Sequence, residues 1–299
     1  MPVYNLVCQH CGYKDTYRTE RTSINCHSCD YKIFISRALN QLDEECIERG
    51  LEKLDITLDV DKDKSRVVPW GDVHVGAPKG QCDWNKAQRE LDYILDTDGA
   101  YMLGMGDYMD CAQKMPWAKG PNIYTSSLTP MQQFSVLEKA LRPLAEAGKI
   151  IGLHSGNHED WIMTTTGIQI IALLCHSLNV RFLGAGCFTT AHVGKQKYVL
   201  YSQHGYGGAQ LKHTKVGRLI NSTKDVFADV MLMGHVHQIA AIKGGKQFGC
   251  KECKAYYVLT GHFLNWEGGY AQTFGLDCCP SGAPKVSLFA DRHDVHISI

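Results

Sequence analysis

Residues 71–76 have the sequence Gly-Asp-Val-His-Val-Gly, which places one carboxylate and one imidazole between two glycines. They follow an apolar run, Val-Val-Pro-Trp at residues 67–70, that predicts a buried strand. Asp72 and His74 can face one crevice only if the backbone turns after this strand, and glycine permits such a turn. A carboxylate and an imidazole in this arrangement are typical ligands of a divalent metal ion.

Four more blocks of the same character occur at the ends of predicted strands. The strands are expected within residues 100–110, 149–154, 198–203 and 229–233. The blocks are Gly106-Asp107-Tyr-Met-Asp110, Gly156-Asn157-His158-Glu159, His204-Gly205 and Gly234-His235-Val-His237. Helices are predicted at 84–95, 130–147, 160–177 and 214–224, and further strands at 180–183, 254–259 and 285–289. This alternation predicts a layered α/β fold with its site at the C-terminal ends of the strands.

In identity and order, the five blocks resemble the motifs of the calcineurin-like metallophosphoesterases over residues 66–299. The resemblance implies a two-sheet β-sandwich flanked by helices and a metal-dependent hydrolase of phosphate esters. It implies that Asp107 bridges two metal ions and that His158 is the general acid. The other implied ligands are Asp72, His74 and His237 for one ion and Asn157, His204 and His235 for the other.

The residue types of these blocks suit that chemistry. Hydrolysis of a phosphate ester needs an activated water, neutralised phosphoryl charge and a proton for the leaving oxygen, and two ions about 3.5–4 Å apart supply the first two. Two neighbouring cations need a bridging anion such as a carboxylate, and an imidazole that titrates near neutrality can supply the proton. Oxygen and imidazole ligands without thiolate suit manganese, iron, zinc, cobalt or nickel, and family habit favours manganese.

Other polar residues near the blocks have alternative interpretations. Asp110 and Glu159 are expected to accept hydrogen bonds from the imidazole N–H groups of the ligands, or else to be solvent-exposed carboxylates. His262 follows a predicted strand that should end near the site. The remaining histidines outside the blocks are interpreted as surface or hydrogen-bonded core residues: His154, His213, His293 and His296.

Two groups of cysteines have the spacing of structural zinc sites. Residues 1–35 are predicted to form a zinc ribbon that holds one zinc ion through Cys8, Cys11, Cys26 and Cys29. Apolar spacing over residues 36–54 predicts an amphipathic helix, so residues 36–65 are interpreted as a linker helix and connector before the domain at 66–299. A second zinc ion, or else a set of unligated thiols, is predicted for Cys250, Cys253, Cys278 and Cys279.

Composition and charge exclude several classes of protein. The chain has 299 residues with 31 basic and 31 acidic side chains, so no global field attracts nucleic acid or an anionic membrane. The N-terminus lacks a signal-peptide pattern, and no apolar run approaches the ~20 residues that span a bilayer. These features predict a cytoplasmic protein, in the host cytoplasm if a phage encodes it, without membrane contact.

The substrate is expected to be a nucleic acid or a nucleotide. A zinc ribbon before these motifs is similar to the metallophosphoesterases of phages and mobile elements, which favours a phosphodiesterase or nuclease. In a predicted loop at 111–129, Trp117 and Tyr124 could stack on bases or anchor the loop. Basic residues that could position phosphates are Lys212, Lys215, Arg218, Lys243, Lys246, Lys251 and Lys254.

Two other functions stay open on the sequence alone. One is a phosphomonoesterase or a small cyclic-nucleotide phosphodiesterase, in which the ribbon only caps the fold. The other is a non-catalytic zinc-ribbon interaction protein, although one lost carboxylate would abolish a two-metal site and every expected ligand is present. A homodimer is a further possible assembly.

Overall fold

The computed structural model describes residues 3–7, 14–18, 23–25, 27–29, 32–34, 52–111, 126–208, 211–248, 251–267, 272 and 278–299. The chain divides into two compact units, Met1–Gly50 and Leu51–Ile299. No single helix among the described residues is long and apolar enough to cross a membrane.

The first unit contains two short antiparallel hairpins. Strand β1 (Val3–Val7) pairs with β2 (Lys14–Arg18), and β3 (Ser23–Asn25) pairs with β4 (Lys32–Phe34). Each predicted pair of zinc ligands therefore falls in the connection between two paired strands. Cys29 is exposed, while Cys8, Cys11 and Cys26 lie outside the described residues, so the zinc ribbon stays a prediction.

The second unit begins earlier in the sequence than expected. Residues 36–50 of the predicted linker helix lie outside the described residues, but residues 52–54 are extended and belong to strand β5 (Glu52–Leu58). This strand pairs in parallel with β9 (Gly186–Val193). The apolar spacing within residues 36–54 did not predict this pairing. Residues 52–65 are therefore part of the larger unit rather than a connector.

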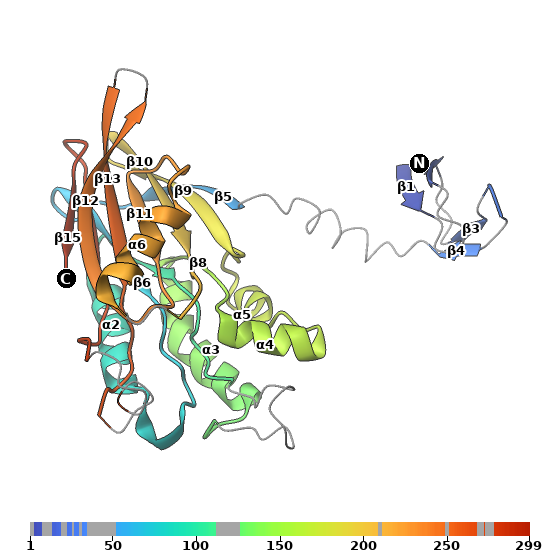
Figure 1. Cartoon of the computed structure of the whole chain (residues 1–299), viewed down its shortest axis with the longest axis horizontal. Coiled ribbons are helices and arrows are strands. Elements are labelled where there is room, and N and C mark those ends of the chain that lie inside the picture. Colours follow the sequence, from blue (N-terminus) through green and yellow to red (C-terminus); the bar gives the residue numbers. More distant parts are fainter. Residues whose placement is uncertain are drawn as a thin grey trace. The chain divides into compact units, whose positions relative to one another are not determined.

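Two sheets form the centre of this unit (Figure 1). The five-stranded sheet has the order β15-β14-β6-β7-β8, with β6 (Lys64–Trp70), β7 (Ala100–Gly104), β8 (Ile150–Leu153), β14 (Lys285–Phe289) and β15 (Val295–Ser298). The six-stranded sheet has the order β12-β13-β11-β10-β9-β5, with β10 (Gln196–Gln203), β11 (Val230–Met233), β12 (Ile239–Phe248) and β13 (Lys251–Thr260). The expected strands at 198–203, 229–233, 254–259 and 285–289 are confirmed.

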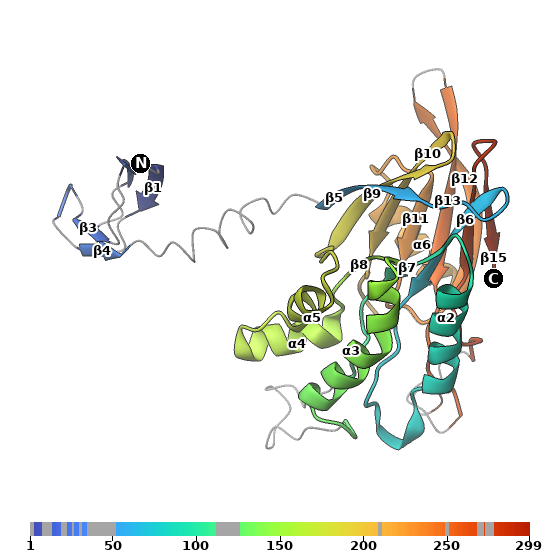
Figure 2. The same cartoon turned by 180° about the vertical axis from the view of Figure 1, so that it is seen from behind.

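Apolar side chains from both sheets form the core between them. Val67, Leu103 and Val286 of the five-stranded sheet lie in one buried cluster with Leu200 and Val258 of the six-stranded sheet. A second cluster joins the other face of the five-stranded sheet to its covering helices, which Figure 2 shows from behind. This mixed α/β architecture with two sheets and flanking helices is consistent with the expected metallophosphoesterase fold.

Local sequence signals explain where two of the helices begin. Helix α2 (Trp84–Asp96) starts at Asp83, whose side chain accepts a hydrogen bond from the backbone of Lys86. Helix α3 (Pro130–Glu146) starts with a capping box at Thr129 and with proline in its first turn. The described residues also form helix α6 (Lys212–Ser222) and the short 3-10 helix η1 (Pro78–Gly80).

The single helix expected at 160–177 is two helices. Helix α4 (Asn157–Thr166) ends at Gly167, which adopts the left-handed conformation with φ of 74°, and α5 (Ile170–Leu178) follows at an angle of 107°. Ile171 and Leu174 of α5 are buried in the core. The expected strand at 180–183 forms only an isolated bridge between Leu153 and Phe182.

The direction of the strands determines where the site lies. Strands β6, β7 and β8 are parallel in one sheet, and β10, β11 and β13 are parallel in the other. The C-terminal ends of parallel strands meet at one edge of a sheet, and the loops at that edge carry the sequence blocks. The fold therefore collects five segments that are far apart in the sequence.

Lys149 gives a test of how the helices are fixed to the sheet. Its Nζ atom donates to the carbonyl oxygens of Ile94, Leu95 and Thr97 at the end of α2, at 2.9, 2.7 and 2.8 Å. We expect Lys149→Met to lower the free energy of unfolding by about 1–3 kcal/mol, because three carbonyls lose a charged donor. Urea unfolding should show this loss, whereas Lys139→Met, at an exposed position of α3, should change stability little. Equal effects of the two substitutions would contradict the capping role.

Candidate metal centre

The structure brings all seven predicted metal ligands together at the ends of five strands. Asp72 and His74 follow β6, Asp107 follows β7, and Asn157 begins α4 after β8. The remaining ligands follow β10 and β11: His204, His235 and His237. Three overlapping groups of three side chains lie there, and within each group the potential ligand atoms are all within 4.8 Å of one another.

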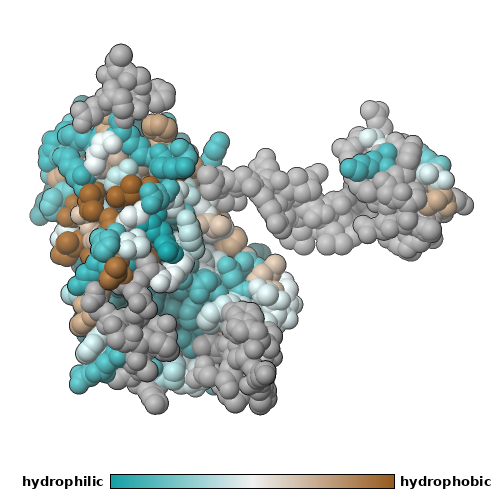
Figure 3. Space-filling model, viewed as in Figure 1, coloured by the Kyte–Doolittle hydropathy of each residue, from teal (hydrophilic) through white to brown (hydrophobic). Residues whose placement is uncertain are grey.

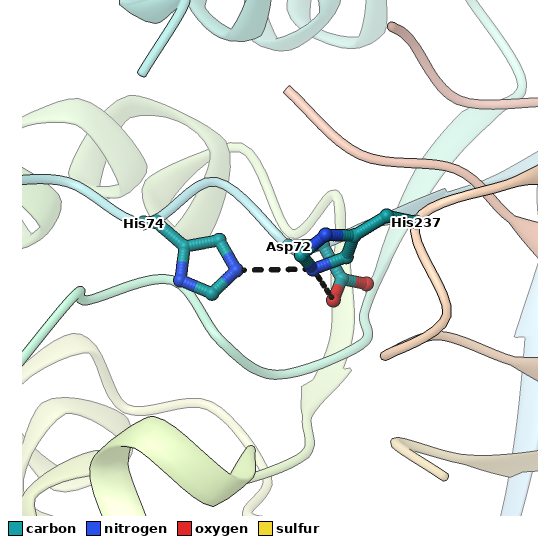
Figure 4. Close-up of side chains that lie close together, drawn as sticks. All are labelled: Asp72, His74 and His237. Carbon is teal, nitrogen blue, oxygen red and sulfur yellow. Dashed lines mark hydrogen bonds and ion pairs between the residues drawn. The ribbon is translucent and has the colours of Figure 1, made fainter. Parts of the chain in front are cut away.

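The first group consists of Asp72, His74 and His237 (Figure 4). The Nε2 atoms of His74 and His237 are 3.3 Å apart, and His237 Nε2 is 3.3 Å from Asp72 Oδ1. Asp72 and His74 are buried, and His237 is partly exposed. Two imidazole nitrogens and a carboxylate oxygen thus point at one position.

The second group consists of Asp107, His204 and His235, with Asn157 beside them. His204 Nε2 is 3.3 Å from Asp107 Oδ2 and 3.2 Å from Asn157 Oδ1. His235 Nδ1 is 2.7 Å from the same amide oxygen. The neutral oxygen of Asn157 therefore lies between two imidazoles, as the sequence-based ligand set requires.

Asp107 connects the two groups. Its Oδ2 atom is 3.3 Å from His204 Nε2 and 3.9 Å from His74 Nε2, so one carboxylate oxygen faces histidines of both groups. The third group combines His74, Asp107 and His158, which places His158 beside the shared carboxylate. The position of Asp107 is the one that a bridging ligand would occupy.

The backbone of the ligand loops is unusual. Asp72, His74, Asp107, His235 and His237 all have φ between 50° and 67°, a left-handed conformation that residues other than glycine rarely adopt. Such conformations persist only where surrounding contacts impose them, and they cluster at functional sites. Asp72 N donates to Gly106 O and Val73 N to Asp107 O, each at 2.9 Å, so hydrogen bonds between loops hold these turns.

Glu159 has a different role from the one expected. Its two carboxylate oxygens accept backbone N–H groups of Asp107, Met109 and Gly156 at 3.0, 2.8 and 2.9 Å, rather than imidazole N–H groups of the ligands. Burial and the nearby charge of Asp107 raise the pKa of Glu159 to about 7. Glu159 is thus neither a ligand orienter nor solvent-exposed, because it ties the start of α4 to the Asp107 loop.

Backbone carbonyls orient the imidazoles of the centre. His204 Nδ1 is 2.7 Å from Met105 O, and His235 Nε2 is 3.1 Å from Gly207 O. His158 Nδ1 contacts the carbonyl oxygen of Asp110, while the Asp110 carboxylate accepts a hydrogen bond from Ser126. The imidazoles thus contact backbone carbonyls, whereas the sequence predicted carboxylates as their acceptors. The opposite ring nitrogens of His204 and His235 face Asn157.

The electrostatics of the centre are dominated by its buried carboxylates. Asp72 and Asp107 are 0% and 1% exposed. Burial opposes the charge of Asp107, but His204 and the other imidazoles outweigh it and hold the pKa of Asp107 well below its usual range. Burial likewise opposes the charge of His204, yet Asp107 raises its pKa to about 10. Burial and His158 lower the pKa of His74.

The donor set fits two divalent cations. Buried anionic oxygens are stable only when a positive charge lies beside them, and two cations would supply that charge with imidazole nitrogens and an amide oxygen as the other ligands. Oxygen and imidazole ligands suit the first-row metals expected from the sequence. The residues that would hold the ions are Asp72, His74 and His237 in one group, Asn157, His204 and His235 in the other, and Asp107 between them.

The rings of Trp161 and His262 lie next to histidines of the centre. Trp161 of α4 lies 4.2 Å from His158 between ring centroids, and sequence reasoning missed it. Its signal was the spacing of three residues from His158, which places both on one side of a helix. His262 lies near the centre as expected, 5.5 Å from His237 between ring centroids, and its Nδ1 accepts a hydrogen bond from Leu264.

The second cysteine group does not gather into a site among the residues that the structure describes. Cys253 is partly buried, Cys278 is exposed and Cys279 is buried, and none of them belongs to a group of potential ligands. Cys250 lies outside the described residues. The second zinc ion therefore stays a prediction without support from these three thiols.

Lys246 of the β12–β13 hairpin lies far from the centre. The hairpin leaves the site at Ile239 and returns at Thr260, so Lys246, opposite Cys253, lies about 20 Å along the strand. Lys246 instead donates to Thr223 O at 2.7 Å, just after α6. Three exposed apolar residues belong to this part of the chain: Ile220, Phe227 and Ile242. Figure 3 shows hydrophobic residues among hydrophilic ones on one face of the larger unit.

Two other basic residues that were predicted to contact phosphates form contacts within the chain. Arg218 donates to Tyr206 O at 2.7 Å and lies over the Tyr206 ring, so its guanidinium is engaged within the chain. Lys254 forms an ion pair of 3.9 Å with Asp294. Trp117 and Tyr124 lie outside the described residues.

Comparisons with known proteins give structural likeness at low identity. No family model and no curated protein matches the sequence. Similar solved structures include a predicted phosphoesterase from Streptococcus pneumoniae, with 14% identity, a TM-score of 0.36, and coverage of 78% of this chain and 88% of that chain. Vacuolar protein sorting 29 from Cryptosporidium parvum has 14% identity and a TM-score of 0.37, and the match covers 79% of this chain and 98% of that chain. Vps29 of Entamoeba histolytica, complexed with zinc, has 14% identity and a TM-score of 0.36, and the match covers 78% of this chain and 97% of that chain. These values transfer no activity to this chain.

The shared carboxylate can be tested by metal analysis. We expect Asp107→Asn to lose most of the manganese that the wild-type protein retains after dialysis, because the amide removes the negative charge between the two groups. Elemental analysis per folded chain measures this loss. Asp98→Asn, at an exposed position before β7, is the matched control and should retain the metal. Wild-type metal content in Asp107→Asn would rule out a bridging role.

His154 predicts a pH dependence of stability. It is fully buried, its Nε2 is 2.8 Å from Ser202 Oγ, and burial lowers its pKa from 6.5 to about 4. Because its folded pKa is depressed, the folded state resists protonation, so stability is retained above pH 6.5 and lost as the pH falls toward 4. Between pH 6.5 and about 4.5, wild-type protein should lose about 2–3 kcal/mol more than His154→Gln in urea unfolding. Identical losses would show that His154 does not titrate in this way.

Proposed function

We propose that this chain is a two-metal-dependent hydrolase of phosphate esters of the calcineurin-like metallophosphoesterase type. The observation that carries the proposal is the Asp107 carboxylate, whose Oδ2 faces His204 at 3.3 Å and His74 at 3.9 Å. A buried carboxylate shared by two imidazole groups suits a pair of adjacent ions better than a single structural ion. When bound, the ions would neutralise phosphoryl oxygens and lower the pKa of an attacking water.

His158 is the proposed general acid. Its Nδ1 contacts the carbonyl oxygen of Asp110, which fixes the ring with Nδ1–H as donor and leaves Nε2 available for a proton transfer. His158 N also donates to Asp107 Oδ1 at 2.9 Å, so the acid and the bridging carboxylate are held together. A leaving oxygen next to this ring would receive its proton from Nε2.

Within this class we favour a phosphodiester of a nucleic acid or a nucleotide as substrate. Trp161 lies against His158, where the leaving group would depart, and an indole ring can stack on a nucleobase. Lys246 and Lys254 of the hairpin contact groups within the chain, so the support for a long polynucleotide groove is weaker than the support for a short substrate. A phosphomonoesterase is the alternative outcome of the assay that follows.

The assay compares bis-p-nitrophenyl phosphate with p-nitrophenyl phosphate on metal-stripped protein resupplied with manganese. We expect faster cleavage of the diester, and His158→Asn should lower kcat by about 10²–10⁴-fold while retaining both metal ions. His176→Asn, at an exposed position of α5, is the control and should have wild-type kcat. Loss of metal from His158→Asn would reassign the residue as a ligand. Absence of metal-dependent activity on either ester would refute the hydrolase.

A further inference from the structure

Lys215 is a buried cation that the proposed reaction does not use. It lies in the first turn of α6 and is 8% exposed. Among the residues that the structure describes, its ammonium group has neither an ion pair nor a hydrogen bond. A buried lysine normally has an anionic partner, because burial removes the water that would stabilise its charge.

The connectivity of the sheet places the first turn of α6 at the edge of the metal centre. Helix α6 connects β10 to β11, which are parallel neighbours, so the helix must start at the edge where both strands end. His204 and His235 follow those same two strands. Leu219, one turn later in α6, packs against Met231 and Met233 of β11. Lys215 on the same side of the helix therefore lies about 5 Å nearer to the edge with the ligands.

The charge of Lys215 acts just outside the ring of metal ligands. His237 lies between His74 and His262, with ring centroids 5.2 and 5.5 Å away. Burial and then His237 are the main causes that lower the pKa of His262, and Lys215 contributes in the same direction. The positive charge of Lys215 is thus felt at His262, which lies beside His237 of the metal centre.

The start of α6 adds to the attraction for an anion. Leu211 precedes the helix without a side-chain cap, and the first turn contains no acidic residue. Unpaired N–H groups and the helix dipole make such a terminus favourable for phosphate oxygens. Arg218, three residues further along α6, donates to the carbonyl oxygen of Tyr206 and is therefore engaged within the chain.

We propose that Lys215 and the first turn of α6 bind a second phosphate group of the substrate, adjacent to the one that is hydrolysed. The proposal rests on the proposed function for the nature of the anion. It defines the substrate chemistry as two neighbouring phosphates, as in a nucleic-acid strand or a nucleoside diphosphate. A substrate with one phosphate would leave Lys215 without a partner.

Binding measurements separate this site from catalysis. Isothermal titration calorimetry uses manganese-loaded protein that carries His158→Asn in every sample, so that hydrolysis of the probes is slowed. The three probes are inorganic phosphate, adenosine diphosphate and a short oligothymidylate. Lys215→Met should raise the dissociation constant of at least one of the two larger probes tenfold or more, and should change that of inorganic phosphate less than twofold. Lys215→Arg should bind within threefold of wild type. Lys224→Met, 74% exposed and beyond the end of α6, is the control.

Each result decides between clear alternatives. Weakened binding of the diphosphate alone identifies a nucleotide, and weakened binding of the oligonucleotide alone identifies a strand. Unchanged affinity of Lys215→Met for both probes, no binding of either by wild type, or an equal loss for inorganic phosphate would overturn the proposal. Lys215→Gln, which keeps a hydrogen-bonding group, replaces the methionine variant if the latter does not fold. Because every titration uses the His158→Asn background, in which kcat is expected to fall strongly while both metal ions are retained, binding is read apart from hydrolysis, and failure of the hydrolase assay and failure of this site remain distinguishable.

Discussion

The structure depends on burying the Asp107 carboxylate among imidazoles. A carboxylate that is 1% exposed is stable only beside positive charge, and without an ion His204 provides it, with a pKa raised to about 10. A pair of cations would take over that role and return His204 to a neutral ligand. The same constraint explains why Glu159, also buried, accepts three backbone N–H groups, which compensate a carboxyl that has no cation of its own.

The architecture serves this charge arrangement. Each sheet contributes parallel strands that end at the same edge, so short loops can deliver ligands without long excursions of the chain. The loops reach their positions through left-handed turns at five ligand residues, and hydrogen bonds between loops offset that conformational cost. Gly156 is needed for close approach, because a Cβ atom there would lie 2.1 Å from Asp107 Oδ1. Strain and close packing are therefore concentrated where the ligands meet.

The surroundings of the centre are unequal on its two sides. Near His158, Trp161 offers an aromatic surface, whereas His262 lies beside His237, and the first turn of α6 with the buried Lys215 is proposed to be on that side. A substrate with an aromatic group on one side of its reacting phosphate and further negative charge on the other would match both. Lys246 of the hairpin, by contrast, stabilises the fold, since it donates to a carbonyl oxygen just after α6.

The sequence by itself identified the residues that meet at the candidate metal centre, their order and most strands and helices, because strand-end blocks and apolar periodicity are local properties. It could not determine the partner of β5, the break at Gly167 or the carbonyl partners of the imidazoles, which depend on residues distant in the chain. It also grouped Lys215 with Lys246, although the fold buries one beside the centre and carries the other away along a hairpin. Residue type is written in the sequence, but burial and the identity of a neighbour exist only once the chain has packed.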